Sequence, residues 1–301
     1  MRERILQPSG MRAALSRVVI AGGLSWLAAA QAHAFCRTTT DTGAPHGCPD
    51  PCTSTGIPLA WSHRDLSYAF NVRGFPGIPD ADLRNQLALS FGAWEEVQCG
   101  GQSVGLDIRA EQATTTLEAG PREAEPNTNV IVYYSAEEWT NYDLPDQAFA
   151  LTAVWFETST GEIVGADMQF NGGLGPYVVC PDDGCPAGTS DVRNVATHEA
   201  GHFLGMAHSD MLNASMSCSA LQGELSKRNL TPDDEAGLCA IYPPGLPSVP
   251  LAGQGVSNAS VMGGGGDCAA TSGSSRGGVF PLLTFLAASF AFRRRRRVPL
   301  T

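Results

Sequence analysis

Residues 198–208 read HEAGHFLGMAH, and this stretch decides the fold and the chemistry that we expect of the chain. His198 and His202 are four residues apart, which places both imidazoles on one face of a helix. Gly205 allows the helix to end and the chain to reverse, because glycine adopts left-handed backbone angles without steric cost. The reversal lets His208 return as a third ligand of one metal ion. The spacing therefore predicts a zinc site.

The number of ligands indicates the kind of zinc site. Three imidazoles leave a fourth position for water, which is typical of catalytic zinc rather than closed structural zinc. Glu199 lies beside the metal without being needed as a ligand, so we expect it to be the general base. A chance match is the alternative interpretation, but the pattern is long, and three of the six histidines of the chain fall inside it.

These residues resemble a known family. HExxHxxGxxH followed by a Met-turn is the signature of metzincin zinc metalloproteases, and it matches His198, Glu199, His202, Gly205 and His208. Met216 follows eight residues after the third histidine, as in matrixin-like (matrix metalloprotease-type) members. The resemblance implies that Met216 forms a hydrophobic floor beneath the imidazoles. It covers about residues 57–245 and is specific mainly around the zinc motif.

The resemblance implies an α+β fold of the metzincin (zincin-like) type. Such a domain has a twisted, mostly parallel five-stranded sheet, an active-site helix and a small C-terminal subdomain that ends in a helix. Local patterns agree with it. Residues 66–72 alternate as in a half-buried strand, residues 151–156 and 163–170 suggest a hairpin, and Leu83, Leu87, Phe91 and Trp94 repeat on one helix face. Asp80 and Ser190 can cap the first helix and the active helix, and Pro232 suits the first turn of the last helix.

The same likeness suggests which metals to expect. We expect one catalytic Zn2+, because the stretches comparable to the family's second, structural zinc site, residues 150–155 and 165–171, contain no histidine. Asp167 lies near the position of the family's calcium sites, so a Ca2+ ion there is a further expectation.

The implied activity is that of a zinc-dependent endopeptidase, which hydrolyses peptide bonds by Glu-assisted attack of zinc-bound water. Its partner would be a protein or peptide substrate. The candidate strand for pairing with an extended substrate contains Leu151, Thr152, Ala153 and Val154. Residues 217–229 are expected to wall the pocket for the residue after the cut. Two alternatives stay open: a zinc-binding surface module without proteolysis, and a cell-wall amidase that uses the same zinc chemistry.

Both ends of the chain carry export signals. Residues 1–34 have a basic start, an apolar stretch and an Ala-His-Ala cleavage site, which is typical of a signal peptide. Near the other end, the apolar residues 277–292 precede five arginines, 293–297. Together with Cys268 this tail resembles the C-terminal sorting signals of myxobacterial-type surface proteins, which would make Cys268 a processing or anchoring site. An ordinary transmembrane helix is the alternative.

We therefore expect an exported bacterial protein that is extracellular or held at the cell surface or outer membrane through its C-terminal segment, and that is a monomer. The expected parts are a signal peptide (1–34), a Cys-containing N-terminal segment (35–56), a matrixin-like metalloprotease domain (57–243), a Gly/Pro/Ser-rich linker (244–276) and the hydrophobic C-terminal helix with its arginines (277–301).

Cysteine content and charge fit an exported protein. Nine cysteines are present, and eight remain when Cys268 is set aside, an even number that suggests disulfide bonds. Cys180 with Cys185 and Cys218 with Cys239 are the pairings that we expect. Residues 35–292 contain 10 basic and 29 acidic residues, a net charge of −19, which argues against a nucleic-acid partner.

Overall fold

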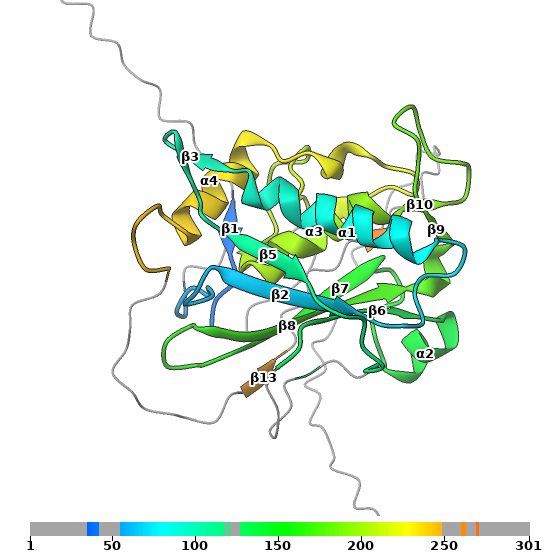
Figure 1. Ribbon diagram of the computed structural model, residues 1–301, viewed down its shortest axis with the longest axis horizontal. Helices are drawn as coiled ribbons and strands as arrows, with labels where there is room; N and C mark the ends of the chain where they lie inside the picture. The colour runs from blue at the N-terminus through cyan, green and yellow to red at the C-terminus, as the bar shows by residue number, and fades with distance from the viewer. Residues whose placement is uncertain are drawn as a thin grey trace, which may run out of the picture. The chain divides into compact units, whose positions relative to one another are not determined.

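A computed structural model describes residues 35–41, 55–117, 120 and 127–248, together with the backbone of two short strands at 260–262 and 269–270 (Figure 1). The expected signal peptide, Cys48, Cys268 and the apolar residues 277–292 lie outside the described residues. Within them, none of the helices is both long and apolar enough to cross a membrane.

The central sheet has the topology that we expected. Its strands lie in the order β5 (Asp107–Ala110), β2 (Asp65–Phe70), β6 (Val130–Tyr134), β8 (Ile163–Asn171), β7 (Ala150–Phe156) and β13 (Ser260–Met262). The first four are parallel, and β7 runs antiparallel to β8. These five strands confirm the mostly parallel five-stranded sheet. The sixth strand, β13, comes from the segment predicted to be a linker and pairs antiparallel with the outer edge of β7.

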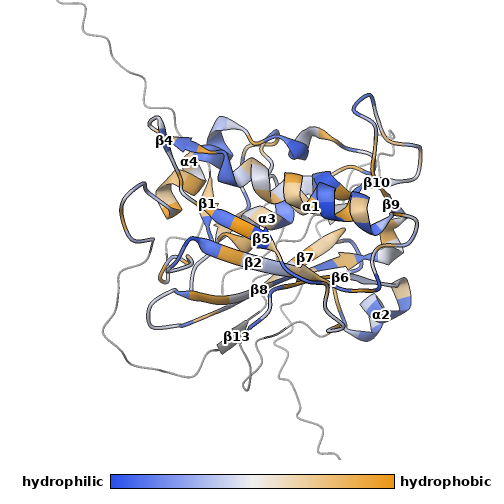
Figure 2. Cartoon of the chain, viewed as in Figure 1, coloured by the Kyte–Doolittle hydropathy of each residue, from blue (hydrophilic) through white to orange (hydrophobic). Residues whose placement is uncertain are grey.

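Helix α1 (Asp80–Glu95) packs against helix α3 (Val192–Phe203) and against β5, and α3 in turn lies against β7 and β8. Its predicted apolar face is buried, as expected for residues spaced at three and four positions. The ring of Phe91 lies 4.5 Å from that of Tyr68 on β2 and 5.2 Å from that of Phe203 on α3, measured between centroids. Hydrophobic residues accordingly mark the inner strands of the sheet in Figure 2. Helix α3 is thereby held against a rigid layer.

Both N-cap predictions need correction. Asp80 is the first residue of α1, and the cap position belongs to Pro79, whose side chain makes no capping hydrogen bond. Ser190 does not cap α3 either. Asp191 does, by accepting a hydrogen bond from the backbone N–H of Asn194. Several neighbouring residues have side chains that can cap a helix. The turn before the helix decides which of them occupies the N-cap position.

The remaining elements are short. Helix α4 (Pro232–Ile241) closes the C-terminal subdomain as predicted, with Pro232 in its first turn. Helix α2 covers Ala136–Asn141. The other elements are β1 (Cys36–Arg37), β3 (Gln98–Cys99), β4 (Gln102–Ser103), η1 (Gly172–Leu174), β9 (Tyr177–Val178), β10 (Ser190–Asp191), β11 (Met206–Ala207), β12 (Ser219–Ala220), η2 (Ser226–Arg228) and β14 (Ala269–Ala270).

One of the two predicted disulfides is confirmed and the other is wrong. Cys180 and Cys185 are bonded and close a small loop before α3. Cys239 is bonded to Cys99, which ties α4 to the β3–β4 hairpin across 140 residues of sequence. Cys218 is itself disulfide-bonded, but Cys239 is not its partner. Cys239 pairs with Cys99 because the two residues are close in the fold, although they are far apart in the sequence.

Candidate metal centre and its surroundings

The three motif histidines lie together in the interior. His198 and His202 come from α3, and His208 follows β11 after the chain has reversed. All three are buried, and each offers a ring nitrogen within 4.8 Å of the others. The ring centroid of His208 lies 5.4 Å from that of His198 and 4.9 Å from that of His202. The predicted reversal therefore places all three imidazoles around one point.

Gly205 makes the reversal possible for two reasons. Its φ angle is +92°, in the region that residues with a Cβ atom avoid. A Cβ atom at this position would also lie 2.7 Å from the carbonyl oxygen of Leu59. The motif glycine is needed both for its backbone angle and for the close approach of a neighbouring segment.

The hydrogen bonds of the rings determine their tautomers. His198 Nδ1 lies 2.5 Å from the carbonyl oxygen of Ser215, and His202 Nδ1 lies 2.9 Å from that of Met206. A carbonyl can only accept, so each Nδ1 carries the hydrogen and each Nε2 presents its lone pair. Carbonyl partners of this kind commonly orient imidazoles that bind a metal.

The two Nε2 atoms are spaced as ligands of one ion. They lie 3.1 Å apart. Two nitrogens at 2.0–2.1 Å from a tetrahedral zinc would be separated by about 3.3 Å. Two lone pairs this close repel one another unless a cation lies between them. The donor set and the spacing both fit Zn2+.

Burial keeps His198 neutral. Its pKa lies well below the ordinary histidine value, first because of desolvation and then because of the positive charge of Lys227 and the neighbouring imidazoles. A neutral imidazole is the form that binds a metal. The environment therefore favours the ligand state of this residue even before an ion arrives.

Glu199 is fully buried beside the histidines and is held by the sheet. The Thr152 hydroxyl on β7 donates to Glu199 Oε2 at 2.6 Å, and Thr152 Oγ1 also lies 3.2 Å from the backbone carbonyl oxygen of Glu199. Thr152, whose side chain is also buried, thus links the candidate substrate strand to the candidate base. In the same strand Leu151 is half-buried, and Ala153 and Val154 are buried.

Met216 is buried and packs against α3 beside Gly201. A Cβ atom on Gly201 would lie 2.2 Å from the Met216 sulfur and 2.8 Å from the Trp94 ring. The missing side chain of Gly201 is therefore what allows Met216 and Trp94 to approach the helix. Trp94 also donates from Nε1 to the Thr197 carbonyl at 2.9 Å.

Asp234 on α4 holds the turn around Met216. Its two carboxylate oxygens accept hydrogen bonds from the backbone N–H groups of Ser215 and Met216, each at 2.9 Å. The preceding Asp233 accepts from the hydroxyl of Ser209, the residue after the third histidine, at 2.6 Å. The first turn of α4 thus holds both the turn that carries Met216 and the residue that follows His208.

A buried lysine lies on the other side of this turn. Lys227 Nζ donates to the carbonyls of Ser217 at 2.6 Å and Ser215 at 3.2 Å. The Ser215 carbonyl is also the acceptor for His198. Lys227 therefore shares one backbone oxygen with the first histidine, which explains its influence on the pKa of that ring.

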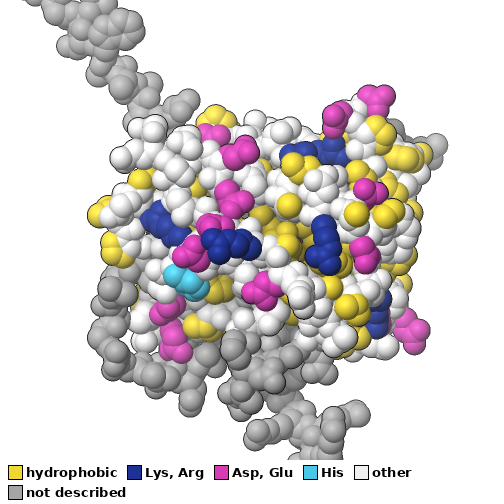
Figure 3. All heavy atoms as spheres, viewed as in Figure 1, with side chains coloured by type: hydrophobic (Ala, Val, Ile, Leu, Met, Phe, Trp, Pro, Cys, Tyr) yellow, Lys and Arg dark blue, Asp and Glu magenta, His cyan; other side chains and the backbone are white. Residues whose placement is uncertain are grey.

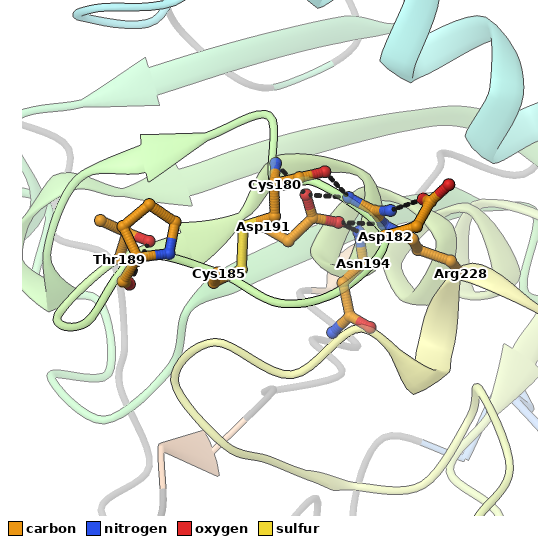
Figure 4. The surroundings of a disulfide bond; sticks show 8 residues. Cys180, Asp182, Cys185, Thr189, Asp191, Asn194 and Arg228 are labelled. Carbon is orange, nitrogen blue, oxygen red and sulfur yellow. Dashed lines mark hydrogen bonds and ion pairs between the residues drawn. A yellow bond between two sulfur atoms is a disulfide. The ribbon is translucent and has the colours of Figure 1, made fainter.

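The disulfide loop before α3 is fixed by an ion pair. Figure 4 shows Arg228 beside Asp191, Asp182 and the Cys180–Cys185 bond. The Arg228 guanidinium contacts Asp191 at 2.7 Å and donates to the Cys180 carbonyl at 2.7 Å. Asp191 raises the pKa of Arg228, chiefly through their hydrogen bonds. The N-terminus of the histidine-bearing helix is thereby anchored on two sides.

Two further groups contain residue types that can bind a metal. Cys180, Cys185 and Asp191 lie close together, but both thiols are consumed by the disulfide. Asp167, the residue near the expected calcium position, is buried and accepts hydrogen bonds from the backbone N–H groups of Val130 at 2.5 Å and Gly120 at 2.8 Å. Calcium at Asp167 stays a prediction.

The sequence predicted the residues around the metal but not those that support them. Thr152 had been singled out only as part of a strand, and Gly201, Lys227, Asp234 and the Asp191–Arg228 pair had no assigned role. A glycine in the middle of a helix was the one available signal, because glycine there is unfavourable unless close packing requires it. The others are ordinary residue types until the fold brings them together.

Comparison with known proteins agrees with this geometry. The sequence profile of the family described as Matrixin matches residues 60–243. The chain is also similar to Metalloendoproteinase 1-MMP of Arabidopsis thaliana, with 46% identity over 54 residues. That stretch covers 18% of this chain and 15% of the plant protein.

Proposed function

The chain belongs to the matrixin family of zinc metalloendopeptidases, and on this premise we propose that it is an exported endopeptidase in which Glu199 is the general base. The observation that carries the proposal is the convergence of His198 and His202 Nε2 with His208 beside a buried carboxylate. A binding module has no use for a base in this position.

His198, His202 and His208 would hold one zinc ion. When bound, zinc lowers the pKa of water and polarises a carbonyl group. The chain itself supplies the ligands in their neutral tautomers and a buried surrounding that excludes bulk water. Met216 supports the imidazoles from below.

Glu199 would take one proton from the attacking water and then deliver it to the nitrogen of the departing amine. One C–N bond breaks, one C–O bond forms, and the proton ends on the new amine, so the carboxylate is restored after each cycle. The Thr152 hydroxyl holds Glu199 Oε2 and so limits the orientations that the carboxylate can adopt.

The substrate would be an extended peptide that pairs with the outer edge of β7. Backbone N–H and C=O groups along the outer edge of a strand can bind a peptide backbone whatever its side chains. Residues 217–229, which follow Met216, would form the wall of the pocket for the residue after the cut. Acidic and basic side chains are intermixed on the face shown in Figure 3.

We further propose that the protein acts as a monomer outside the bacterial cell or at its surface. The basic and apolar start of the chain supports export, and the apolar residues 277–292 with the arginines beyond them support attachment of the C-terminal segment.

The decisive experiment presents the zinc-loaded protein with a peptide library and with peptidoglycan, each with and without a chelator. We expect chelator-sensitive cleavage of peptides only. Cleavage of peptidoglycan alone would identify a cell-wall amidase. Zinc binding without cleavage of either material would identify a binding module.

The variant Glu199→Gln tests the role of the base. It should keep stoichiometric zinc by elemental analysis while peptide hydrolysis falls about 10²- to 10⁴-fold. Glu137→Gln, on the exposed surface of α2, is the matched control and should leave the rate unchanged. A native rate in Glu199→Gln would remove this residue from the mechanism.

A further inference from the structure

Two backbone segments from the C-terminal part of the chain lie beside the elements that frame the metal centre. Strand β13 pairs antiparallel with β7, with Ser260 opposite Phe156 and Met262 opposite Val154. Strand β14 pairs in parallel with β12, with Ser219 opposite Ala269 and Ala220 opposite Ala270. Both partners are the elements proposed above to bind substrate.

The direction of β13 is significant. Because the pairing is antiparallel, β13 runs along β7 from Phe156 towards Val154 (Figure 1). Thr152, which contacts Glu199, is two residues further in the same direction. The C-terminal end of β13 therefore points along β7 towards the position of the candidate base.

Strand β14 pairs with the segment that follows the Met-turn. Its partner β12 begins three residues after Met216. Between β13 and β14 the sequence contains only the six residues GGGGDC. One continuous stretch of chain thus pairs first with the strand that carries Thr152 and then with the segment that follows the Met-turn.

We propose that β13 and β14 together act as an intramolecular inhibitor that occupies the substrate-binding edges of β7 and β12. This inference rests on the proposed function, since it assigns β7 and β12 as the substrate-binding edges. The backbone groups of Val154–Phe156 that pair with β13 cannot pair with a substrate at the same time. A tethered segment competes at an effective concentration of about millimolar, so even a weak strand is an effective competitor.

The test uses the full exported chain with two adjacent prolines in β13, Val261→Pro with Met262→Pro. Alternate residues of a strand direct their N–H groups to the partner, so one of any adjacent pair must donate to β7. Proline has no N–H to donate. Ala269→Pro with Ala270→Pro does the same for β14. Leu251→Pro with Ala252→Pro, in the same linker before β13, is the matched control.

The first measurement is the kinetics of peptide hydrolysis. Release of a competitive inhibitor lowers KM and leaves kcat unchanged. We expect KM for a peptide of about ten residues to fall by roughly fivefold or more in the proline variants, the range that a millimolar effective concentration allows. The control should behave as the native chain. Equal KM values in the native chain, the two proline variants and the control would overturn the proposal.

The second measurement needs no activity and separates this inference from the proposed function. Amide hydrogen exchange of the segment containing Val154–Phe156 should be slow in the native chain and the control, and faster in the β13 variant. If no protein cleaves peptides but this protection is lost in the variant, the endopeptidase assignment fails and the placement of β13 stands. If exchange is identical in native chain and variant, the placement is wrong.

Discussion

At the scale of single residues, Thr152 has a role that its residue type does not suggest. Its hydroxyl is buried and reaches Glu199 Oε2 from the strand that faces the helix. We expect Thr152→Val, which keeps the shape but removes the donor, to lower kcat/KM about fivefold, the effect of one hydrogen bond of ~1 kcal/mol. The kinetics of peptide hydrolysis measure the change in kcat/KM, and elemental analysis measures the zinc content.

Zinc content should remain stoichiometric in this variant, since Thr152 is not among the expected ligands. Thr140→Val, on the exposed surface of α2, is the control and should keep full activity. A Thr152→Val protein as active as the native chain would show that Glu199 needs no support from β7.

Gly201 is the second residue whose importance depends on its surroundings. We expect Gly201→Ala to lower the free energy of unfolding by about 1–3 kcal/mol, the usual effect of overpacking, because the new methyl group meets the Met216 sulfur and the Trp94 ring. Gly92→Ala in α1 is the control, because nothing lies within 4 Å of its added Cβ.

Unfolding in denaturant measures the free energy of unfolding of both glycine variants. Gly92→Ala should be neutral or stabilise by up to about 1 kcal/mol, the ordinary difference between alanine and glycine in a helix. Equal effects of the two substitutions would mean that Met216 and Trp94 can move aside, and that the close packing beneath the histidines is not required.

At the scale of elements, the start of α4 holds the Met-turn in place. We expect Asp234→Ala to destabilise the fold by about 2–4 kcal/mol, because it removes the acceptor of two buried N–H groups and a helix cap together. Thermal unfolding of the metal-free protein measures this effect without a contribution from zinc binding.

Glu235→Ala is the matched control for this substitution. Glu235 is exposed in the same first turn of α4, so its loss should change the melting temperature little. If Asp234→Ala were as stable as Glu235→Ala, water would have to replace the carboxylate at both backbone groups, and the Met-turn would not depend on α4.

At the scale of the whole molecule, stability should depend on pH through Glu95. Its pKa is raised, chiefly by burial and further by the negative charges of Asp107 and Glu96, although a hydrogen bond from the Ile108 N–H lowers it in part. A carboxyl group with a raised folded-state pKa binds its proton more tightly in the folded protein. Its ionisation therefore costs stability, starting as the pH rises through the ordinary glutamate value.

We expect Glu95→Gln to raise the melting temperature at pH 7, and this gain should shrink as the pH falls below the ordinary glutamate pKa. The glutamine carbonyl can still accept from Ile108, so the hydrogen bond is kept. Melting curves between pH 3 and 8 of the native chain, this variant and the exposed control Glu111→Gln measure the difference. A gain independent of pH would contradict the electrostatic explanation.

Much of the fold and of the site could be predicted because it depends on local spacing. The interval of four between His198 and His202, the glycine before His208 and the alternation along β2 each specify a face or a turn from neighbouring residues alone. The N-caps were misassigned because capping depends on the path of the preceding turn.

From the sequence by itself, helical spacing predicted the three histidines and Glu199 of the candidate metal centre, because a helical period is a property of a short segment. The family resemblance implied the mostly parallel sheet that the structure confirms. Only the tertiary structure decided that Cys239 joins Cys99, that Asp234 accepts hydrogen bonds from the Met-turn, and that β13 and β14 pair with β7 and β12. These contacts join residues far apart in the chain. Many partners satisfy the same local chemistry there, and only packing around a common core selects among them.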